Sequence, residues 1–366
     1  MQPDLICKYS SDINQKEAAM LDSILKHYDF NILSVEKVRS AYKVYTDNGV
    51  FCLKRVGHGY RKAKKCFYII KHLRDKGFNN VAEYYQTREK KIFLKLDDAA
   101  FYITYWIEGR EASFRIIDDI LRCAELLASF HNHAKGFEAP KHVTIKSDYK
   151  KWKKHFEKYL KQMEAFKSSI DKLKLKSEFD YMYRNCADYY CNEARLAIKL
   201  LKQSKYADLS EYQKNELYVC HDSFYYQNII ISDSKELYLV DLESCLYDIP
   251  MSDLGKFIRR VMTKGKYKWD FDLCRKIIES YSKIRPVSKE EYAILLTMLI
   301  FPHKFWKLGR KRYVKNKKWN EEKFKKKLKK IIKYREYKKE FIKCFMSFYN
   351  PGFEFSPDEL EVSIKH

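Results

Sequence analysis

The spacing of apolar residues changes near residue 110 of this chain, and that change limits the folds that the sequence can adopt. Between residues 30 and 109, short runs rich in Val, Ile, Tyr and Phe alternate with turn residues, as they do in β-strands. Beyond residue 110, apolar residues mainly recur every three or four positions, as they do in amphipathic helices. We therefore expect an α+β protein with its strands near the start and its helices in the remainder.

The early strands include a hairpin with a recognisable turn. Asp47, Asn48 and Gly49 lie between two β-rich runs, and Asn and Gly tolerate the positive φ angles of tight turns. A helix is expected at 61–76, so the pattern is that of a small sheet packed by one helix. The full set expected in this part is strands at 30–38, 40–46, 49–56, 81–87, 91–96 and 100–109, and helices at 14–27 and 61–76.

One β-rich island interrupts the helical remainder. It reads NIIISDSKELYLVDLES over residues 228–244, with a polar turn at 232–235. Two strands alone among helices are hard to stabilise, so we expect the loops that they carry to hold the chemistry. The helices expected around the island are 118–134, 148–167, 180–203, 254–264, 270–283, 288–298, 320–337 and 338–348.

Three residues on or near these strands match the needs of phosphoryl transfer. That reaction requires a lysine at the phosphates, oxygen ligands for a metal ion and a group that accepts the hydroxyl proton. Lys54 lies on the strand after the hairpin, Asn228 opens the island, and Asp241 closes its second strand. A lysine after two apolar residues is usually a solvated strand residue, so it is the ordered set of three that favours this chemistry.

The segment before the island, VCHDSFYYQNIII at 219–231, has the spacing of a kinase catalytic loop from His221 to Asn228. In the template H-R-D-x-x-x-x-N, the catalytic aspartate lies five residues before the asparagine. Ser223 occupies that position here, and Asp222 is one residue earlier. A serine hydroxyl cannot accept a proton near neutral pH as a carboxylate can. Asp222 could serve as the base only if a one-residue bulge brought its carboxylate round.

Six segments together resemble the bacterial spore-coat CotS-like family, within the aminoglycoside phosphotransferase and choline kinase branch of the protein-kinase-like fold. They are VRSAYKVYTDNGVFCLKR, IIKHLRDKGFNNV, YITYWIEGRE, LLASFHNH, CHDSFYYQNIII and LVDLESCLYDIPMSDLGKFI. The resemblance implies a two-lobed fold, with a β-rich N-terminal lobe over 1–107 that covers the nucleotide. The mainly helical C-terminal lobe, over 108–366, would carry the catalytic-loop-like and metal-binding hairpin at 219–245.

The same resemblance implies roles for individual residues. Lys54 would pair the α- and β-phosphates of ATP, and Asn228 and Asp241 would hold Mg²⁺. The adenine would be received by backbone groups of Tyr105, Trp106 and Ile107.

Two further residues would support the loop. The resemblance implies that His221 braces it against the Asp241 turn and that Asp253 holds it by hydrogen bonding. Two departures from the family weigh against catalysis. Ser223 replaces the catalytic aspartate, and the helix expected at 61–76 contains no glutamate to pair Lys54.

These features predict a kinase-fold spore-coat protein that binds ATP and Mg²⁺ between its lobes and whose phosphotransfer is impaired or absent. One alternative is an active phosphotransferase that uses Asp222 on a small molecule or a coat protein. Another is a basic scaffold of the coat that uses no nucleotide. The resemblance implies synthesis in the mother-cell cytoplasm, followed by assembly with coat-protein partners on the spore.

The charge of the chain bears on its partners. The net charge of +24 attracts polyanions, including nucleic acid, but a lysine-rich solvated surface accounts for it as simply. The basic segment 302–340 reads as a solvated helix face, or as a docking surface for acidic coat partners, nucleic acid or anionic lipid. We expect no membrane-spanning segment, because no window holds eighteen charge-free apolar residues. We also expect no metal site made of histidines and cysteines, with His131 and His133 as packing or surface residues.

Overall fold

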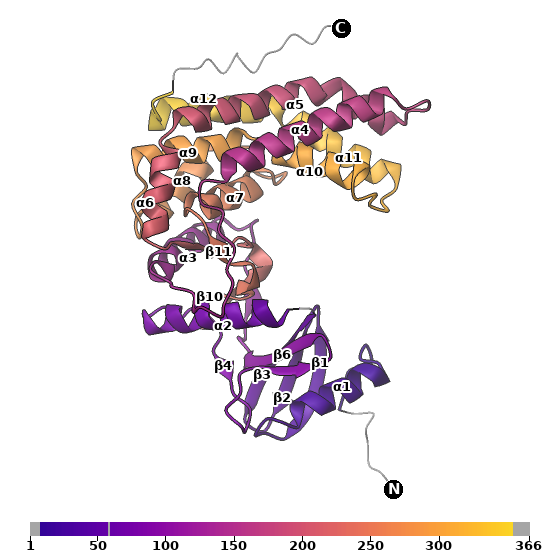
Figure 1. The fold of residues 1–366 in the computed structure, drawn as a ribbon, viewed down its shortest axis with the longest axis vertical. Coiled ribbons are helices and arrows are strands. Elements are labelled where there is room, and N and C mark those ends of the chain that lie inside the picture. Colours follow the sequence, from indigo (N-terminus) through magenta and orange to yellow (C-terminus); the bar gives the residue numbers. More distant parts are fainter. Residues whose placement is uncertain (1–7, 58, 354–366) are drawn as a thin grey trace. The chain divides into compact units, whose positions relative to one another are not determined.

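In the computed structural model, which describes residues 8–57 and 59–353, the chain divides into two compact units (Figure 1). The first is formed by Met1–Ser113, Ser129–Lys146 and His221–Leu246, and the second by Phe114–Ala128, Ser147–Cys220 and Tyr247–His366. Strands gather in the first unit and helices in the second, so the predicted two-lobed α+β fold is confirmed. The β island lies in the same unit as the N-terminal strands, although more than a hundred residues separate them in sequence.

The first unit contains an antiparallel sheet in the order β1-β2-β3-β6-β4, with β5 also pairing β6. The hairpin predicted at Asp47–Gly49 joins β2 to β3, and Gly49 has a φ of +112° that favours glycine. The bounds of these elements are α1 Gln15–Leu25, β1 Ile32–Val38, β2 Ala41–Thr46, β3 Gly49–Gly57, α2 Tyr60–Asp75, β4 Tyr84–Tyr85, β5 Leu94–Leu96 and β6 Ala99–Tyr105.

The central strands of this sheet bury side chains on both faces, because successive side chains of a strand point to opposite sides. Phe51 and Leu53 of β3 pack in one apolar cluster with α1. Val56 of the same strand packs in a second cluster with Ala63 of α2 and Tyr102 of β6. Lys54 shares the strand parity of Val56, so the sheet directs the lysine to the side covered by α2.

From the sequence we expected the β island to be a pair of strands alone. The structure shows that it has a third strand. Strands β9 (Ile229–Ile231) and β10 (Leu237–Leu239) form a hairpin, and β7 (Arg110–Glu111) pairs with β9 as a third strand. Strand β7 is only two residues long, so no alternation of apolar and polar residues could predict it from the sequence. Asn228 ends a short 3₁₀ turn, η1 (Tyr226–Asn228), and Asp241 directly precedes another, η2 (Leu242–Ser244).

The second unit is a bundle of helices around α9 (Lys289–Ile300). Every residue of α9 from Ala293 to Ile300 is buried, so this part of the helix is enclosed on all sides. The remaining elements of the chain are α3 Ile117–Ala134, which continues from the second unit into the first, α4 Trp152–Asp171, α5 Glu178–Gln203, α6 Tyr206–Asn215, β8 Val219–Cys220, β11 Leu246–Tyr247, α7 Met251–Met262, α8 Phe271–Ser282, α10 His303–Tyr313, α11 Glu321–Lys333 and α12 Arg335–Tyr349. In residues 8–57 and 59–353, no helix combines the length and the apolar character needed to cross a bilayer.

Two helices, α6 and α10, were not predicted from the sequence. The sequence of α10, HKFWKLGRKRY, is basic and contains a glycine, so its own pattern is weak. Its packing explains it: the Phe305 ring stacks on Tyr183, with centroids 4.1 Å apart, and on Tyr190 at 4.3 Å. A Cβ on Gly309 would lie 2.3 Å from the Tyr183 hydroxyl, so the glycine permits the close approach of α10 to α5.

Candidate functional site

The Lys54 side chain reaches two carboxylates within the first unit. Its Nζ donates to Asp241 Oδ1 at 2.8 Å and to Glu243 Oε1 at 3.2 Å. Tyr102 lies directly opposite Lys54 in the β3–β6 register, and its hydroxyl donates to the same Glu243 oxygen at 3.1 Å. Lys54 on β3 and Tyr102 on β6 thus both bind the segment after β10.

This cluster is only partly open to solvent. The side chain of Asp241 is 42% exposed, whereas those of Lys54 and Glu243 are 18% and 20% exposed. Desolvation lowers the pKa of Lys54, but the charges of Asp241 and Glu243 outweigh it and raise that pKa to about 12. The lysine therefore stays charged at neutral pH, and Asp241 is the carboxylate best placed to meet a ligand.

Helix α2 also holds this segment, but with a lysine. The Nζ of Lys65 donates to the carbonyl of Glu243 at 2.8 Å and to that of Cys245 at 2.6 Å. Desolvation lowers the pKa of Lys65. As noted from the sequence, α2 carries no glutamate for Lys54, and the partner role falls instead to Glu243, two residues after Asp241.

Asn228 lies next to the Asp241 turn through the backbone, because its carbonyl accepts from Val240 N–H at 3.0 Å. Its side-chain Nδ2 donates to the Ser223 carbonyl at 3.0 Å and to the Ser223 hydroxyl at 3.2 Å. The amide is thereby oriented, which leaves Oδ1 as the oxygen that could ligate a cation. Asp241 itself has a φ of +65°, a left-handed conformation in which asparagine and aspartate are enriched among the residues other than glycine.

The two candidates for the base position differ in conformation. Asp222 has a φ of +61°, so the chain turns away from an extended path directly after β8. Both Asp222 and Ser223 are half-buried, and the Ser223 hydroxyl already accepts a hydrogen bond from Asn228. The left-handed residue is a local irregularity of the kind that a shifted base would need.

The two residues expected to support the loop are both fully buried. His221 lies with its ring near those of Phe130 and Phe224, at centroid distances of 5.9 and 6.1 Å. Asp253 lies in the first turn of α7. Their bracing roles remain predictions.

The segment expected to receive adenine follows β6. The amide of Tyr105 donates to Glu83 O at 3.0 Å, and that of Trp106 donates to Val50 O at 2.9 Å. Those two N–H groups are therefore engaged within the protein. Ile107 lies one residue beyond them and outside the strand, so it offers the better-placed amide of the three for a ligand.

Two cationic side chains, Lys43 and Arg39, form contacts near the segment expected to receive adenine. Lys43 Nζ lies 2.8 Å from Glu108 Oε1 and 4.9 Å from the centre of the Trp106 ring. In the β1–β2 turn, Arg39 has a φ of +57° and forms an ion pair with Glu111 of β7. These contacts fix the turn without the glycines that phosphate-binding loops often use.

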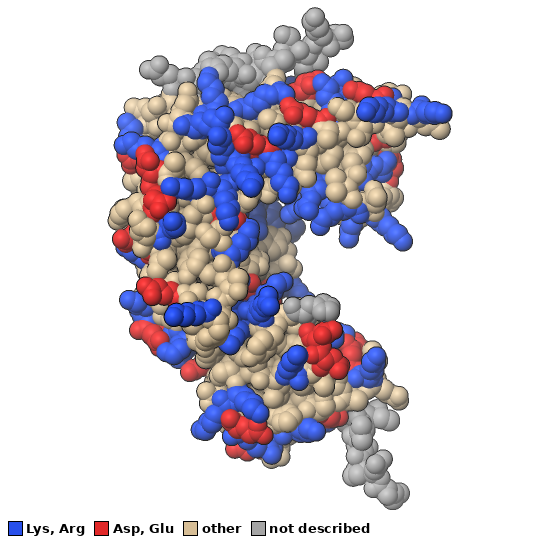
Figure 2. Space-filling model, in the orientation of Figure 1, with Lys and Arg blue, Asp and Glu red and all other residues tan. Residues whose placement is uncertain are grey.

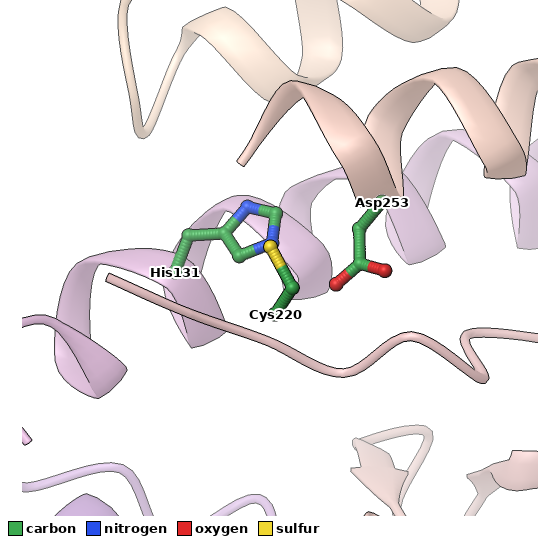
Figure 3. A group of neighbouring side chains, drawn as sticks. All are labelled: His131, Cys220 and Asp253. Carbon is green, nitrogen blue, oxygen red and sulfur yellow. The ribbon is translucent and has the colours of Figure 1, made fainter. Parts of the chain in front are cut away.

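Figure 3 shows three buried residues that could each offer a ligand atom to a metal ion: His131 on α3, Cys220 on β8 and Asp253 on α7. We did not expect such a group from the sequence. All three side chains have other interactions within the protein. The Cys220 thiol donates to the carbonyls of Asp248, at 3.4 Å, and Ile249, at 3.2 Å. Because those contacts use the protonated thiol, whereas a metal requires the thiolate, we assign no metal here.

Comparison with known proteins identifies the family. The model of the family described as "Spore coat putative kinase YutH" matches residues 21–345. The chain belongs to this family. It is also similar to "Spore coat protein S" of Bacillus subtilis (strain 168), with 26% identity over 341 residues that cover 90% of this chain and 94% of the relative.

Solved structures show the same fold at low identity. An aminoglycoside phosphotransferase from Alicyclobacillus acidocaldarius matches with a TM-score of 0.80 and 17% identity, over 90% of this chain and 96% of that one. Spectinomycin phosphotransferase APH(9)-Ia, in complex with ADP and spectinomycin, matches with a TM-score of 0.61 and 15% identity, over 91% and 98%. The amicoumacin kinase hAmiN, in complex with AMP-PNP, Ca²⁺ and Ami, matches with a TM-score of 0.56 and 11% identity, over 94% and 97%.

Three residues of the site were not singled out from the sequence. Glu243 carried a usable signal, because it is a second carboxylate two residues after Asp241 in the same loop. Lys65 and Tyr102 carried none, since nothing in a helix rich in lysine or a strand rich in tyrosine distinguishes the one side chain that reaches this loop. Only the β3–β6 register and the packing of α2 select them.

Proposed function

We propose that this chain is a kinase-fold protein of the spore coat that binds ATP with Mg²⁺ in its first unit, and that its capacity for phosphotransfer is impaired or absent. The single observation that carries the proposal is the contact of 2.8 Å between Lys54 and Asp241 beside Asn228. A cation for phosphates and oxygen ligands for a metal thus lie together, while the position of the base holds Ser223.

The donor set fits a magnesium ion. Mg²⁺ prefers oxygen ligands and is usually held by one or two carboxylates together with phosphate oxygens. Asp241 would supply the partly exposed carboxylate and Asn228 its oriented Oδ1, with Glu243 close by. The ion, when bound, neutralises phosphate charge; Lys54 would add its own charge at the phosphates, and the Ile107 amide would donate to the adenine.

The impairment of phosphotransfer rests on Ser223. A hydroxyl near neutral pH does not accept a proton as a carboxylate does, and this one already accepts a hydrogen bond from Asn228. The second candidate function is an active phosphotransferase, toward a small molecule or a coat protein, in which Asp222 is the base. The left-handed φ of Asp222 favours it, because that conformation gives the loop the irregularity that a shifted base requires.

A place in the spore coat is supported by the family and by the Bacillus subtilis relative named spore coat protein S. We propose synthesis in the mother cell and partners among the coat proteins.

The nucleotide proposal is tested by thermal unfolding with ATP and MgCl₂. We expect millimolar ATP with Mg²⁺ to raise the melting temperature, because a ligand that binds the folded state stabilises it. Asp241→Asn should remove the part of the shift that depends on Mg²⁺. Asp233→Asn is the matched control, since it removes an exposed carboxylate at the tip of the same hairpin and should leave the shift intact.

Two results would count against the proposal. An unchanged melting temperature for the unaltered protein at millimolar nucleotide would remove the binding claim and leave the scaffold alternative. Transfer of radiolabelled phosphate from ATP to a coat extract, lost in Asp222→Asn and retained in Ser223→Ala, would replace impaired phosphotransfer with the active alternative.

A further inference from the structure

The helical unit contains a cavity that the proposed nucleotide site does not use. Its volume is about 350 Å³, and it is lined by residues from α5, α7 and α9 to α12. All of these helices belong to the second unit. A cavity of this size falls in the range of sites for small organic ligands.

Positive charge is concentrated around this cavity. Six cationic side chains that line it form no ion pair with a carboxylate in the part of the chain that the structure describes: Arg259, Lys304, Lys307, Lys311, Lys327 and Lys330. The one acidic side chain among the described lining residues is Glu193, and Lys338 already pairs with it at 2.9 Å. In Figure 2, Lys and Arg side chains gather over the region where Figure 1 places α10 and α11.

The concentration of cations around the cavity destabilises the folded protein when no ligand is bound. Desolvation and nearby cations, Lys330 and Arg259 among them, lower the pKa of Lys304 to about 7. Desolvation and Arg260 lower the pKa of Arg259 to about 9. Like charges held together in partly desolvated positions repel one another, and a bound anion would reverse the sign of that interaction.

The beginning of α10 adds a second feature suited to anions. Pro302, His303 and Lys304 line the cavity and start this helix of 11 residues, which has no side-chain cap. The first amides of a helix have no acceptor within the helix, and its N-terminus carries partial positive charge. The His303 amide donates to the Phe301 carbonyl at 2.8 Å, so the next amides, those of Lys304 and Phe305, are the ones that could meet a ligand. Backbone and side chains at this end of α10 therefore favour the same ligand charge.

Aromatic rings complete the lining. The Trp319 ring lies beside the cations of Lys311, at 4.6 Å, and Lys327, at 5.2 Å. Trp269, which is almost fully buried, and Phe301 also contribute to the wall. Apolar walls with a few convergent charges are typical of sites for organic ligands that carry ionised groups.

We propose that this cavity binds a small, multiply charged anion, carrying phosphate or carboxylate groups, that also has an apolar or aromatic part. The cavity is lined by residues of the second unit, whereas the cluster around Lys54 belongs to the first. It also gives part of the basic segment 302–340 a role more specific than a solvated helix face or a docking surface.

The test uses isothermal titration with pyrophosphate and with citrate, in a buffer that has been stripped of metal ions by chelating resin and contains 150 mM NaCl to screen nonspecific attraction. We expect saturable binding to the full chain. The double variant Lys327→Met, Lys330→Met should weaken binding at least about tenfold, because each charge-assisted contact is worth more than 1 kcal/mol. Phenyl phosphate should bind more tightly than inorganic phosphate.

The matched control is Lys326→Met, Lys329→Met. These lysines lie on the same helix beside the tested pair, are exposed, and do not line the cavity, so both variants lose the same charge and should fold equally well. The control should retain the affinity of the unaltered protein.

Three outcomes would overturn the proposal. The first is the absence of saturable binding of either anion. The second is equal weakening in the two double variants, which would show that net charge alone governs binding. The third is tighter binding of a single-stranded oligonucleotide, reduced equally in both variants, which would mark a general surface for nucleic acid.

Discussion

Single side chains in this protein hold charge where water is largely excluded. Lys54 is stabilised by Asp241 and Glu243, so burial and ionisation are compatible there. Asp248, in the second unit, is less well compensated. It is 2% exposed and accepts hydrogen bonds from the Trp152 indole, at 3.0 and 3.2 Å, and from the Ile249 amide, at 2.9 Å. Burial nevertheless raises its pKa to about 6.

Asp248 should therefore give the unfolding free energy a pH dependence. Because its pKa in the folded protein lies above the ordinary 3.8, its contribution to stability is present at low pH and is lost as pH rises through about 6. Asp248→Asn cannot ionise. Relative to the unaltered protein, the unfolding free energy of the variant should increase by about 2–2.5 kcal/mol between pH 4 and pH 7, at about 1.4 kcal/mol for each pKa unit.

Urea unfolding at the two pH values measures this difference. Asp233→Asn, at an exposed carboxylate, should show almost none of it. A difference between Asp248→Asn and the unaltered protein that stays constant from pH 4 to pH 7 would contradict the prediction.

At the scale of elements, the three-stranded sheet of β7, β9 and β10 supports the loops that carry Asn228 and Asp241. Gly109 lets the chain approach β9 directly before β7. Its φ is +140°, and a Cβ at this position would lie 2.1 Å from the Ile231 carbonyl oxygen. Because backbone atoms on both sides are fixed by strand pairing, neither can move without breaking the sheet.

We accordingly expect Gly109→Ala to lower the unfolding free energy by about 3 kcal/mol, from steric overlap added to backbone strain. Gly136→Ala separates the two causes, because Gly136 also has a positive φ, +78°, but has open space around its would-be Cβ. That variant should lose only about 1–2 kcal/mol. Denaturant unfolding measures the unfolding free energy of both variants. Equal losses of unfolding free energy would show that the close packing of Gly109 against β9 contributes nothing to stability.

At the scale of the whole molecule, the net charge of +24 makes the folded chain repel itself. Added salt screens this repulsion, with a Debye length that falls to about 10 Å at 0.1 M. We expect the melting temperature to rise by about 1–2 °C between 10 and 200 mM NaCl, which corresponds to about 1 kcal/mol for a chain of this size. Calorimetry measures the melting temperature at each salt concentration. A fall in the melting temperature over the same range would mean that the surface ion pairs outweigh the repulsion.

Much of the fold follows from local sequence. The hairpin at Asp47–Gly49 formed as predicted because a tight turn depends on the φ preferences of its own residues. Helices such as α1 and α2 also matched their periodic patterns to within two residues. The helix expected at 148–167 begins instead at Trp152, because Lys150 adopts a φ of +59° that no local pattern indicates.

The sequence by itself determined the order of the N-terminal strands and of most helices, the spacing of Lys54, Asn228 and Asp241, and the presence of Ser223 where the kinase template has an aspartate. These features depend on neighbours in the chain or on residue identity. Only the tertiary structure decided that Glu243 pairs with Lys54, that α10 is a helix, and that eight lysines and arginines line one cavity. Those outcomes depend on contacts between residues distant in sequence, and such contacts are fixed by strand register and helix packing rather than by any local period.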